Sequence, residues 1–119
     1  NLTHNMNFHF YLLPKTYVFT KSLDFNEHTL LFFSESNYNT SIIEKSKALN
    51  LKIDYTFESR CIKLLTKTKL TDVGISSKIT SILASNNIPC NVISGYDNDY
   101  FFVPVNDGLK AFQILNSLS

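Results

Sequence analysis

The order of elements in the second half of the chain restricts the fold more than any other feature. Between residues 60 and 118 the sequence predicts a strand, a helix, two strands and a final helix. This order is a split β-α-β unit that lacks its last strand. Because an open apolar sheet edge favours aggregation, we expect the N-terminal half of the chain to supply the missing strand, so that the two halves depend on each other.

The helix of this unit is the clearest element in the sequence. Its apolar residues fall at positions i, i+4, i+7 and i+8, and they are Ile75, Ile79, Ile82 and Leu83. Thr71 or Asp72 is expected to cap its start, and Asn86 and Asn87 to end it in a left-handed turn. The strands are expected at 60–66, 88–94 and 99–105, with a hairpin loop at 95–98. The last helix should follow Asn106 or Asp107 and turn four residues inward: Leu109, Phe112, Leu115 and Leu118.

The first half has a weaker pattern. Residues 1–14 show no clear period and are expected to form a tail, or a short helical turn, that ends at Pro14. Runs of β-branched and aromatic residues predict strands over 16–20 and 29–34, with a polar loop over 21–28. With the helix and strand that follow, the first half reads as strand, strand, helix and strand, which is also incomplete on its own.

A capping-box spacing predicts the next helix. Ser41 and Glu44 stand three residues apart, so the serine side chain can accept from the third amide while the glutamate reaches back. The helix should end near Asn50 and should carry three residues towards the sheet: Ile42, Ile43 and Leu49.

A change of phase separates the two halves. Ile53, Tyr55 and Phe57 alternate and predict a strand with these side chains on one face. The apolar phase shifts near Ser59, where we expect a break or bulge. The expected organisation is therefore a tail at 1–14, a first half at 15–58 and a second half at 59–119.

Composition excludes several classes of protein. The chain has 119 residues, 44% hydrophobic and 18% charged, which is typical of one globular domain rather than of a disordered chain. The net charge is +1 and Arg60 is the only arginine, so we expect no nucleic-acid partner. No apolar run is long enough to span a membrane, and no secretory signal is visible. Cys61 and Cys90 lie in apolar runs, which favours buried thiols in a reducing cytoplasm.

Catalytic and metal-binding patterns are absent from the sequence. There is no G-x-S-x-G motif, and Cys61 and Cys90 have no histidine near them in the chain. His4 and His9 are five residues apart, which does not match a helical zinc pair. An EF-hand loop starting at Asp97 would need glycine and glutamate where the chain has two other residues, Phe102 and Gly108. We therefore expect no cofactor, no metal and no enzymatic activity, with a thiol or Asp97/Asp99 enzyme as the weaker reading.

The start of the clearest helix is the one candidate binding feature. Gly74 precedes the first turn, whose amides are free donors in a positive field and can hold a carboxylate. On spacing alone, capping by Asp72 or Thr71 explains the same residues more simply.

These residues carry a resemblance to a known family. The stretch from Thr71 to Ile75, followed by Ile79, Leu83 and the run Asn91-Val92-Ile93-Ser94, resembles the aspartokinase-type ACT domain. The continuation over residues 95–105 is similar to short bacterial stand-alone proteins made of two ACT-like halves. The likeness covers residues 60–118 well and the first half more loosely. The histidines that this family often carries after Gly95 and Tyr96 are replaced here by Asp97, Asn98, Asp99 and Tyr100.

The resemblance implies both a fold and a function. The fold would be α+β and ferredoxin-like, with antiparallel sheets covered by helices on one side and two interlocked halves. The function would be non-catalytic regulation through binding of a small amino acid or a partner protein, in a cytoplasmic protein that forms a homo-oligomer, most simply a dimer. Carried over by position, the ligand site would comprise Asp72, Val73, Gly74 and Ile75 and, opposite them, Asn91, Val92, Ile93 and Ser94. The alternative is a structural dimerisation or interaction module without a ligand.

Overall fold

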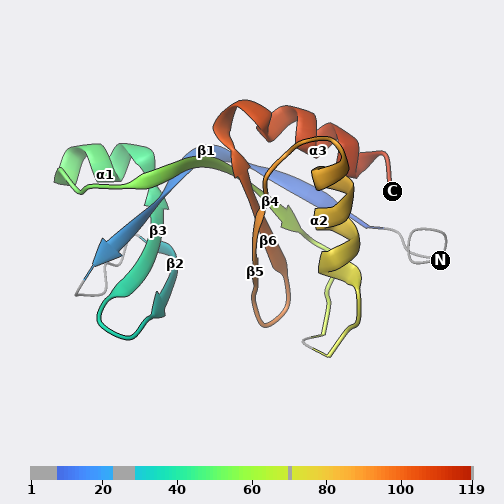
Figure 1. Cartoon of the computed structure of the whole chain (residues 1–119), viewed down its shortest axis with the longest axis horizontal. Coiled ribbons are helices and arrows are strands. Elements are labelled where there is room, and N and C mark those ends of the chain that lie inside the picture. Colours follow the sequence, from blue (N-terminus) through green and yellow to red (C-terminus); the bar gives the residue numbers. More distant parts are fainter. Residues whose placement is uncertain (1–7, 23–28, 70, 119) are drawn as a thin grey trace. The chain divides into compact units, whose positions relative to one another are not determined.

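The computed structural model describes residues 8–22, 29–69 and 71–118. Its strands are β1 (Phe10–Ser22), β2 (Thr29–Ser34), β3 (Asn39–Glu44), β4 (Thr56–Leu64), β5 (Asn91–Ser94) and β6 (Asp99–Pro104). Its helices are α1 (Lys45–Leu51), α2 (Ile75–Ser85) and α3 (Gly108–Asn116), and a short 3₁₀ helix, η1 (Val105–Asp107), precedes α3. The hydrogen-bonded strand order over these ranges is β2-β3-β1-β4-β6-β5 (Figure 1). The sheet is antiparallel with helices on one side, which confirms the predicted α+β, ferredoxin-like class.

The chain divides into two compact units. Unit 1 comprises Asn1–Pro14 and Arg60–Ser119, and unit 2 is Lys15–Ser59. β1 and β4 are each divided between the two units, because the unit boundaries fall within these two strands. Unit 1 therefore has β1-β4-β6-β5 with α2 and α3, and unit 2 has β2-β3-β1-β4 with α1.

The missing strand of the second half comes from the N-terminal half of the chain, as predicted, but from a segment that we expected to be a tail. Residues 10–14 form the first part of β1, so the expectation of a tail or helical turn ending at Pro14 is wrong for them. The Leu65 amide donates to the His9 carbonyl at 2.7 Å, and an Arg60 guanidinium nitrogen donates to the Leu13 carbonyl at 2.9 Å. The part of the expected tail before residue 8 lies outside the described residues.

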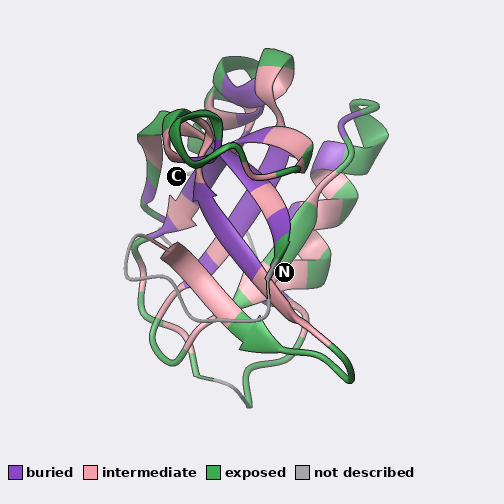
Figure 2. Ribbon diagram, turned by 90° about the vertical axis from the view of Figure 1, so that its left-hand side faces the viewer, coloured by how far each residue is buried: buried purple, intermediate pink, exposed green. Residues whose placement is uncertain are grey.

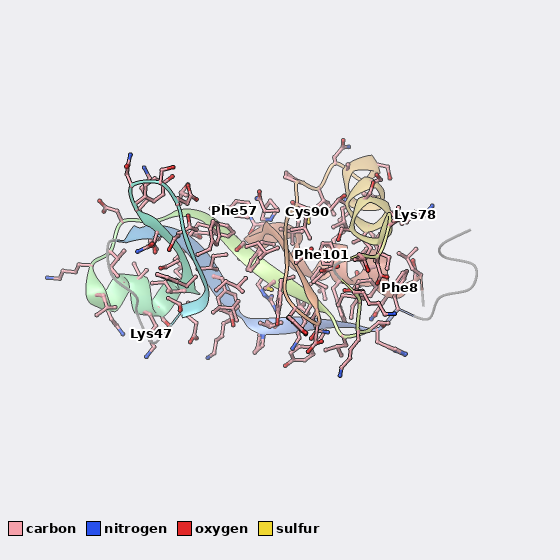
Figure 3. The ribbon with its side chains drawn as sticks, turned by 90° about the horizontal axis from the view of Figure 1, so that it is seen from below. Phe8, Lys47, Phe57, Lys78, Cys90 and Phe101 are labelled. Carbon is pink, nitrogen blue, oxygen red and sulfur yellow. The ribbon has the colours of Figure 1, made fainter. Side chains whose placement is uncertain are left out.

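The core of unit 1 lies between its strands and its two helices. Three of the four residues of the predicted α2 stripe are buried, namely Ile75, Ile79 and Leu83, whereas Ile82 is partly exposed. The three pack in one cluster with Phe8, Phe10, Ile62, Leu64, Ile88, Phe101, Val103, Ala111 and Leu115. Figure 2 shows the buried stretches of the strands and helices, and Figure 3 labels Phe8 and Phe101 of this cluster. Phe8 and Phe10 stand two residues apart, as strand residues that share one face do. Burial of each large side chain stabilises the unit by about 1.5–3 kcal/mol.

The last helix turns three of its four predicted residues towards the core: Leu115 is buried, and Phe112 and Leu118 pack partly buried against the same cluster. The prediction is wrong for Leu109, in whose place Ala111 faces the core. Leu109 is 59% exposed, whereas Ala111 and Leu115 are buried. The helix starts at Gly108, which packs so closely on Arg60 that a Cβ at this position would lie 2.5 Å from the Arg60 Cγ. The close contact fixes the rotation of α3, and residues 111 and 115, four apart, then face the core.

Unit 2 contains a strand where the sequence predicted a helix. Residues 39–44 form β3, and α1 begins only at Lys45, without a side-chain cap at Glu44. Ile42 and Ile43 pair with Phe19 and Val18 on β1. These β-branched residues fit a strand better than a helix, and the tertiary pairing overrides the capping-box spacing. Ser41 supports the strand as well, because its carbonyl accepts from the buried Thr20 hydroxyl at 3.0 Å.

β4 continues through Ser59, near which a break or bulge was predicted, and the irregular backbone lies two residues earlier in the same strand. Ser59 is buried and donates from its hydroxyl to the Tyr17 carbonyl at 2.9 Å. The irregular residue is Phe57, whose φ of 54° lies in the left-handed region. Ile53 and Tyr55 pack on the small cluster of Val18, Ile43 and Ala48. Phe57 instead contacts Phe19, the strand neighbour of Val18 that points to the other face, so the predicted common face does not exist.

Candidate functional site

The start of α2 is shaped by a glycine rather than by a capping side chain. Gly74 is the N-cap residue and has a φ of 82°, a conformation that favours glycine because it has no Cβ. Asp72 does not cap the helix as predicted, because its Oδ2 accepts from the Lys69 amide at 2.6 Å. The Asp72 amide in turn donates to the Lys69 carbonyl at 2.9 Å. Asp72 therefore closes the loop before the helix, and Gly74 has no side chain with which to cover the first-turn amides.

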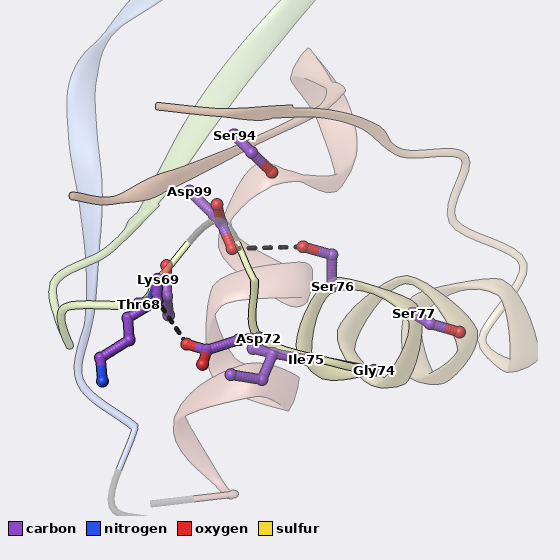
Figure 4. Close-up of a pocket in the computed structure, with 9 residues that line it drawn as sticks. All are labelled: Thr68, Lys69, Asp72, Gly74, Ile75, Ser76, Ser77, Ser94 and Asp99. Atoms are coloured by element: carbon purple, nitrogen blue, oxygen red, sulfur yellow. Dashed lines mark hydrogen bonds between the residues drawn. The ribbon is translucent and has the colours of Figure 1, made fainter. Parts of the chain in front are cut away.

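The β5–β6 hairpin brings a buried carboxylate to the same place. Ser94 and Asp99 face each other across the hairpin, and the Gly95 amide closes its loop by donating to the Asn98 carbonyl at 2.8 Å. The Asp99 residue is only 5% exposed. Its Oδ2 accepts from the Ser76 hydroxyl in the first turn of α2 at 3.2 Å (Figure 4). Strand β6 and helix α2 are thus joined by a side-chain hydrogen bond.

A small polar cavity of unit 1 lies between these elements. Its volume is about 130 Å³, which corresponds to about four water molecules. It is lined by Thr68, Lys69, Asp72, Gly74, Ile75, Ser76, Ser77, Ser94 and Asp99 (Figure 4). Hydroxyl, carboxylate and backbone groups meet here, whereas the end of the Lys69 side chain points away from Asp99 and Ser76 (Figure 4). The cavity can therefore accept both a negative and a positive group of a small ligand.

Half of the predicted site residues line this cavity. They are Asp72, Gly74, Ile75 and Ser94. Val73 is 87% exposed and does not line it. Asn91, Val92 and Ile93 lie further along β5, which is also shorter than the predicted strand over 88–94. Only Ser94 stands at the end of β5 that adjoins the hairpin loop and the cavity.

Sequence reasoning missed the residues that complete the cavity. Asp99 begins the strand predicted over 99–105, and Lys69 precedes the predicted helix, and neither position alone indicates a binding site. The pairing of Ser94 with Asp99 across the hairpin is a usable signal, because it places Asp99 beside a predicted site residue. Ser76 lies outside the apolar stripe of α2, and its hydroxyl contacts Asp99.

The two cysteines are poor nucleophiles. Burial raises the pKa of Cys61 to about 12, with a smaller contribution from Cys90, and burial raises the pKa of Cys90 to about 11. Both are free and remain protonated at neutral pH, whereas nucleophilic attack requires the thiolate. Within the described ranges, no three histidine, cysteine, aspartate or glutamate side chains come together to hold a metal ion. No helix in the same ranges is long and apolar enough to cross a membrane.

Comparison with known proteins identifies the larger part of the chain. The model of the ACT domain matches residues 56–117, which include β4, α2, β5, β6 and most of unit 1. No curated protein matches the sequence.

Solved structures share the fold over nearly the whole chain. A protein of unknown function from Vibrio cholerae, described as a possible transport protein, has a TM-score of 0.83 and 24% identity and covers 93% of this chain and 89% of its own. A protein from Agrobacterium tumefaciens has a TM-score of 0.73 and 16% identity, with coverages of 95% and 90%. Aspartokinase III from Escherichia coli, solved with aspartate and ADP, has a TM-score of 0.66 and 13% identity; the match covers 92% of this chain and 32% of that enzyme.

Proposed function

Because the chain belongs to the ACT-domain family, whose members are regulatory modules that bind small ligands, we propose that it binds a small amino acid in the cavity at the start of α2. The module acts without catalysis and transmits the binding event to a second copy or to a partner enzyme in the cytoplasm. The proposal rests on one observation: uncovered helix-start amides and a buried carboxylate line the same cavity.

The two ends of the cavity suit the two charges of an amino acid. The first-turn amides of α2, which follow Gly74, are suited to the α-carboxylate, because a helix start carries a positive field and free donors. The Asp99 carboxylate is suited to the α-ammonium through a charge-assisted hydrogen bond, with the Ser94 hydroxyl beside it. The volume of about 130 Å³ favours a ligand with a small side chain.

In this proposal, the remaining predicted residues lie on the surface that a second copy of the chain would cover. Asn91 and Val92 are exposed on β5, the last strand in the hydrogen-bonded order. A second copy that pairs with this edge would cover the cavity mouth, and Ile93 and Val73 would lie in the covered surface. The site is then completed by a homodimer, and the ligand and the oligomeric state are coupled.

Calorimetric titration of the purified protein against the twenty amino acids at millimolar concentration tests the proposal. We expect binding heat from at least one amino acid with a small side chain, and an increase in sedimenting mass on its addition. Asp99→Asn should weaken this binding about tenfold or more, because the charge-assisted bond is lost. Asp97→Asn is the matched control, since Asp97 is exposed in the same hairpin and does not line the cavity.

Two outcomes would contradict this proposal. If no amino acid gives heat and the mass stays constant, the sensor function is refuted and the interaction module without a ligand remains. If binding occurs but Asp99→Asn and Asp97→Asn weaken it equally, the assignment of the ammonium to Asp99 is wrong. Circular dichroism of each variant establishes that the fold is intact.

A further inference from the structure

Unit 2 carries a second hollow surface that the ligand site in unit 1 does not use. Two adjoining hollows share Phe19, Lys21 and Thr56, and we call their combined surface the trough. The larger hollow has a volume of about 500 Å³, and the smaller one of about 210 Å³. The other lining residues are Ile53, Asp54 and Tyr55 in the larger hollow and Thr20, Tyr38 and Thr40 in the smaller. The larger hollow lies in the size range of pockets for small organic ligands.

Aromatic rings form the apolar part of the trough. Phe19 meets the ring of Phe57 edge-to-face, with centroids 5.5 Å apart and planes at 73°. Phe57 reaches this position only through its φ of 54°, which is rare and costly for a bulky residue. Such conformations are concentrated at functional sites. Phe57 lines neither hollow, but its ring packs on Phe19, which lines both and points away from the small core of Val18.

One end of the trough holds a fixed cation. The Lys21 Nζ lies 4.6 Å from the centroid of the Tyr38 ring. Glu35 holds this tyrosine in place: it accepts from the Thr40 hydroxyl at 2.6 Å, and its hydrogen bond with Tyr38 raises the pKa of the tyrosine. The bonds from Thr40 and Tyr38 keep the pKa of Glu35 below its ordinary value, with a smaller contribution from Lys21. Glu35 is therefore engaged in holding Tyr38, and the ammonium of Lys21 stands beside the apolar surface.

The charges select the class of ligand. Lys21 and Asp54 line the same hollow of about 500 Å³, together with Phe19, Ile53 and Tyr55. An anionic group is attracted by Lys21 and repelled by Asp54, and a cationic group shows the reverse, so a ligand with only one charge gains from one residue and loses from the other. A zwitterion with a ring gains from both, while its apolar body covers aromatic surface.

We infer that the trough is a second ligand site, which takes a small zwitterion with an aromatic body, such as an aromatic α-amino acid. Lys21 binds the carboxylate, Asp54 binds the ammonium, and Phe19 contacts the ring. This site differs from the cavity in unit 1, whose volume and hydroxyl-rich lining favour a small side chain. The inference concerns unit 2 alone and does not depend on the function proposed for unit 1.

Binding of L-phenylalanine to the full chain, followed through the backbone amide resonances, tests the site. We expect shifts at Lys21 and Thr56 that saturate in the millimolar range, without comparable shifts at Ser76 in the other cavity. 3-Phenylpropionate, which lacks the ammonium, and 2-phenylethylamine, which lacks the carboxylate, should each bind about threefold to fivefold more weakly, as expected for the loss of one exposed charge pair.

Two charge variants turn this ranking into a specific test. Lys21→Gln should abolish the preference for L-phenylalanine over 2-phenylethylamine, and Asp54→Asn should abolish the preference over 3-phenylpropionate. Lys15→Gln is the matched control, because Lys15 is an exposed lysine on the same strand that does not line the trough. No shifts at Lys21 and Thr56 at millimolar ligand, or a ranking unchanged in both variants, overturns the inference. Shifts that occur only around Ser76 also overturn it, since the ligand then binds in unit 1.

Discussion

The two units use the same number of hydrogen-bonded strands but cover them differently. Unit 1 is covered by α2 and α3, of 11 and 9 residues, which bury one large apolar cluster on the strands. Among its described residues, unit 2 has α1, of 7 residues, which packs in the small cluster of Val18, Ile43 and Ala48, and Tyr17 and Ile42 are buried as well. Both units belong to one chain and share β1 and β4, so the difference lies in what covers the strands.

This difference separates two ways of making a binding surface. In unit 1 the large core fixes the helix start and the hairpin, and a small polar cavity remains between rigid elements. In unit 2 the helix packs on the face of Val18, and aromatic side chains such as Phe19 lie in an open trough on the other face. We therefore expect unit 1 to carry most of the stability and unit 2 to tolerate change more readily.

The largest expected loss of stability comes from substitutions in the cores of the two units. Leu83→Ala removes a fully buried side chain from the large cluster and should cost about 4 kcal/mol of unfolding free energy. Ile43→Ala makes a similar change in the small cluster and should cost about 2 kcal/mol, because a thinly covered site can collapse around the cavity. Chemical denaturation measures both losses, with Ile82→Ala on the partly exposed side of α2 as the control. Equal losses for the two core variants would remove the energetic distinction between the units.

A smaller effect is expected at the tightest contact in unit 1. In Gly108→Ala the new Cβ would lie 2.5 Å from the Cγ and 2.7 Å from the Cβ of Arg60. Both atoms are close to the backbone and cannot move aside, so overpacking should cost about 1–3 kcal/mol, partly offset by the better helix propensity of alanine.

A double-mutant cycle identifies the cause of that loss. With Arg60→Ala in the background, the penalty of Gly108→Ala should fall in part, because the contact with the Cγ at 2.5 Å is gone while the contact with the Cβ at 2.7 Å remains. Arg60→Ala alone also loses the hydrogen bond to the Leu13 carbonyl and is the reference for the cycle. An unchanged Gly108→Ala penalty in this background would show that the contact with the Arg60 Cγ is not the cause of the loss.

The sequence predicted unit 1 better than unit 2 for a physical reason. The stripe Ile75, Ile79 and Leu83 is a local pattern that fits only a helix, so the two ends of α2 were predicted to within about one helical turn. The first part of β1 was missed because its partner, Arg60, lies far along the chain, and strand pairing is not encoded within one segment. In unit 2, the spacing of Ser41 and Glu44 predicts a helix locally. Residues 39–44 form the strand β3 instead because they pair with β1, which lies in another part of the sequence.

The candidate site shows the same division between local and distant information. Gly74 was predictable because a glycine before an apolar stripe is a local signal for a helix start. Asp99 was predictable only in part: the hairpin loop at 95–98 sets it opposite Ser94, but the packing of α2 beside the hairpin, which brings Ser76 to it, is not encoded locally. The aromatic trough was likewise hidden, since Phe57 reaches Phe19 only through an unusual backbone angle.

The next effect in size concerns the backbone of the site in unit 1. Gly74 has a φ of 82°, so Gly74→Val should cost about 1–2 kcal/mol, and Gly74→Asn should cost less because asparagine tolerates left-handed conformations. Thermal unfolding measures both. If valine and asparagine are equally destabilising, bulk rather than backbone angle controls this position. In the sensor proposal both variants also weaken amino-acid binding, whereas a pure interaction module would retain its function.

The smallest effect concerns the charged groups that join α1 to β4 in unit 2. The Lys45 Nζ lies 3.1 Å from the Glu58 Oε1, which also accepts from the Tyr55 hydroxyl at 3.2 Å. The hydrogen bond from Lys45 lowers the pKa of Glu58 from its ordinary value of 4.5, and the bond to Glu58 raises the pKa of Lys45 from 10.5. Both shifts favour the charged forms in the folded chain.

The pH dependence follows from these directions. The stability contributed through Glu58 is present above pH 4.5 and is lost as the pH falls through the lowered value, and that through Lys45 is present below pH 10.5 and is lost as the pH rises through the raised value. Glu58→Gln should therefore be slightly less stable than the parent chain at neutral pH and should match it near pH 3, as measured by denaturation at each pH. A deficit of the same size at pH 3 would show that Glu58 acts by packing, and the charged contact would then contribute nothing to holding α1 on unit 2.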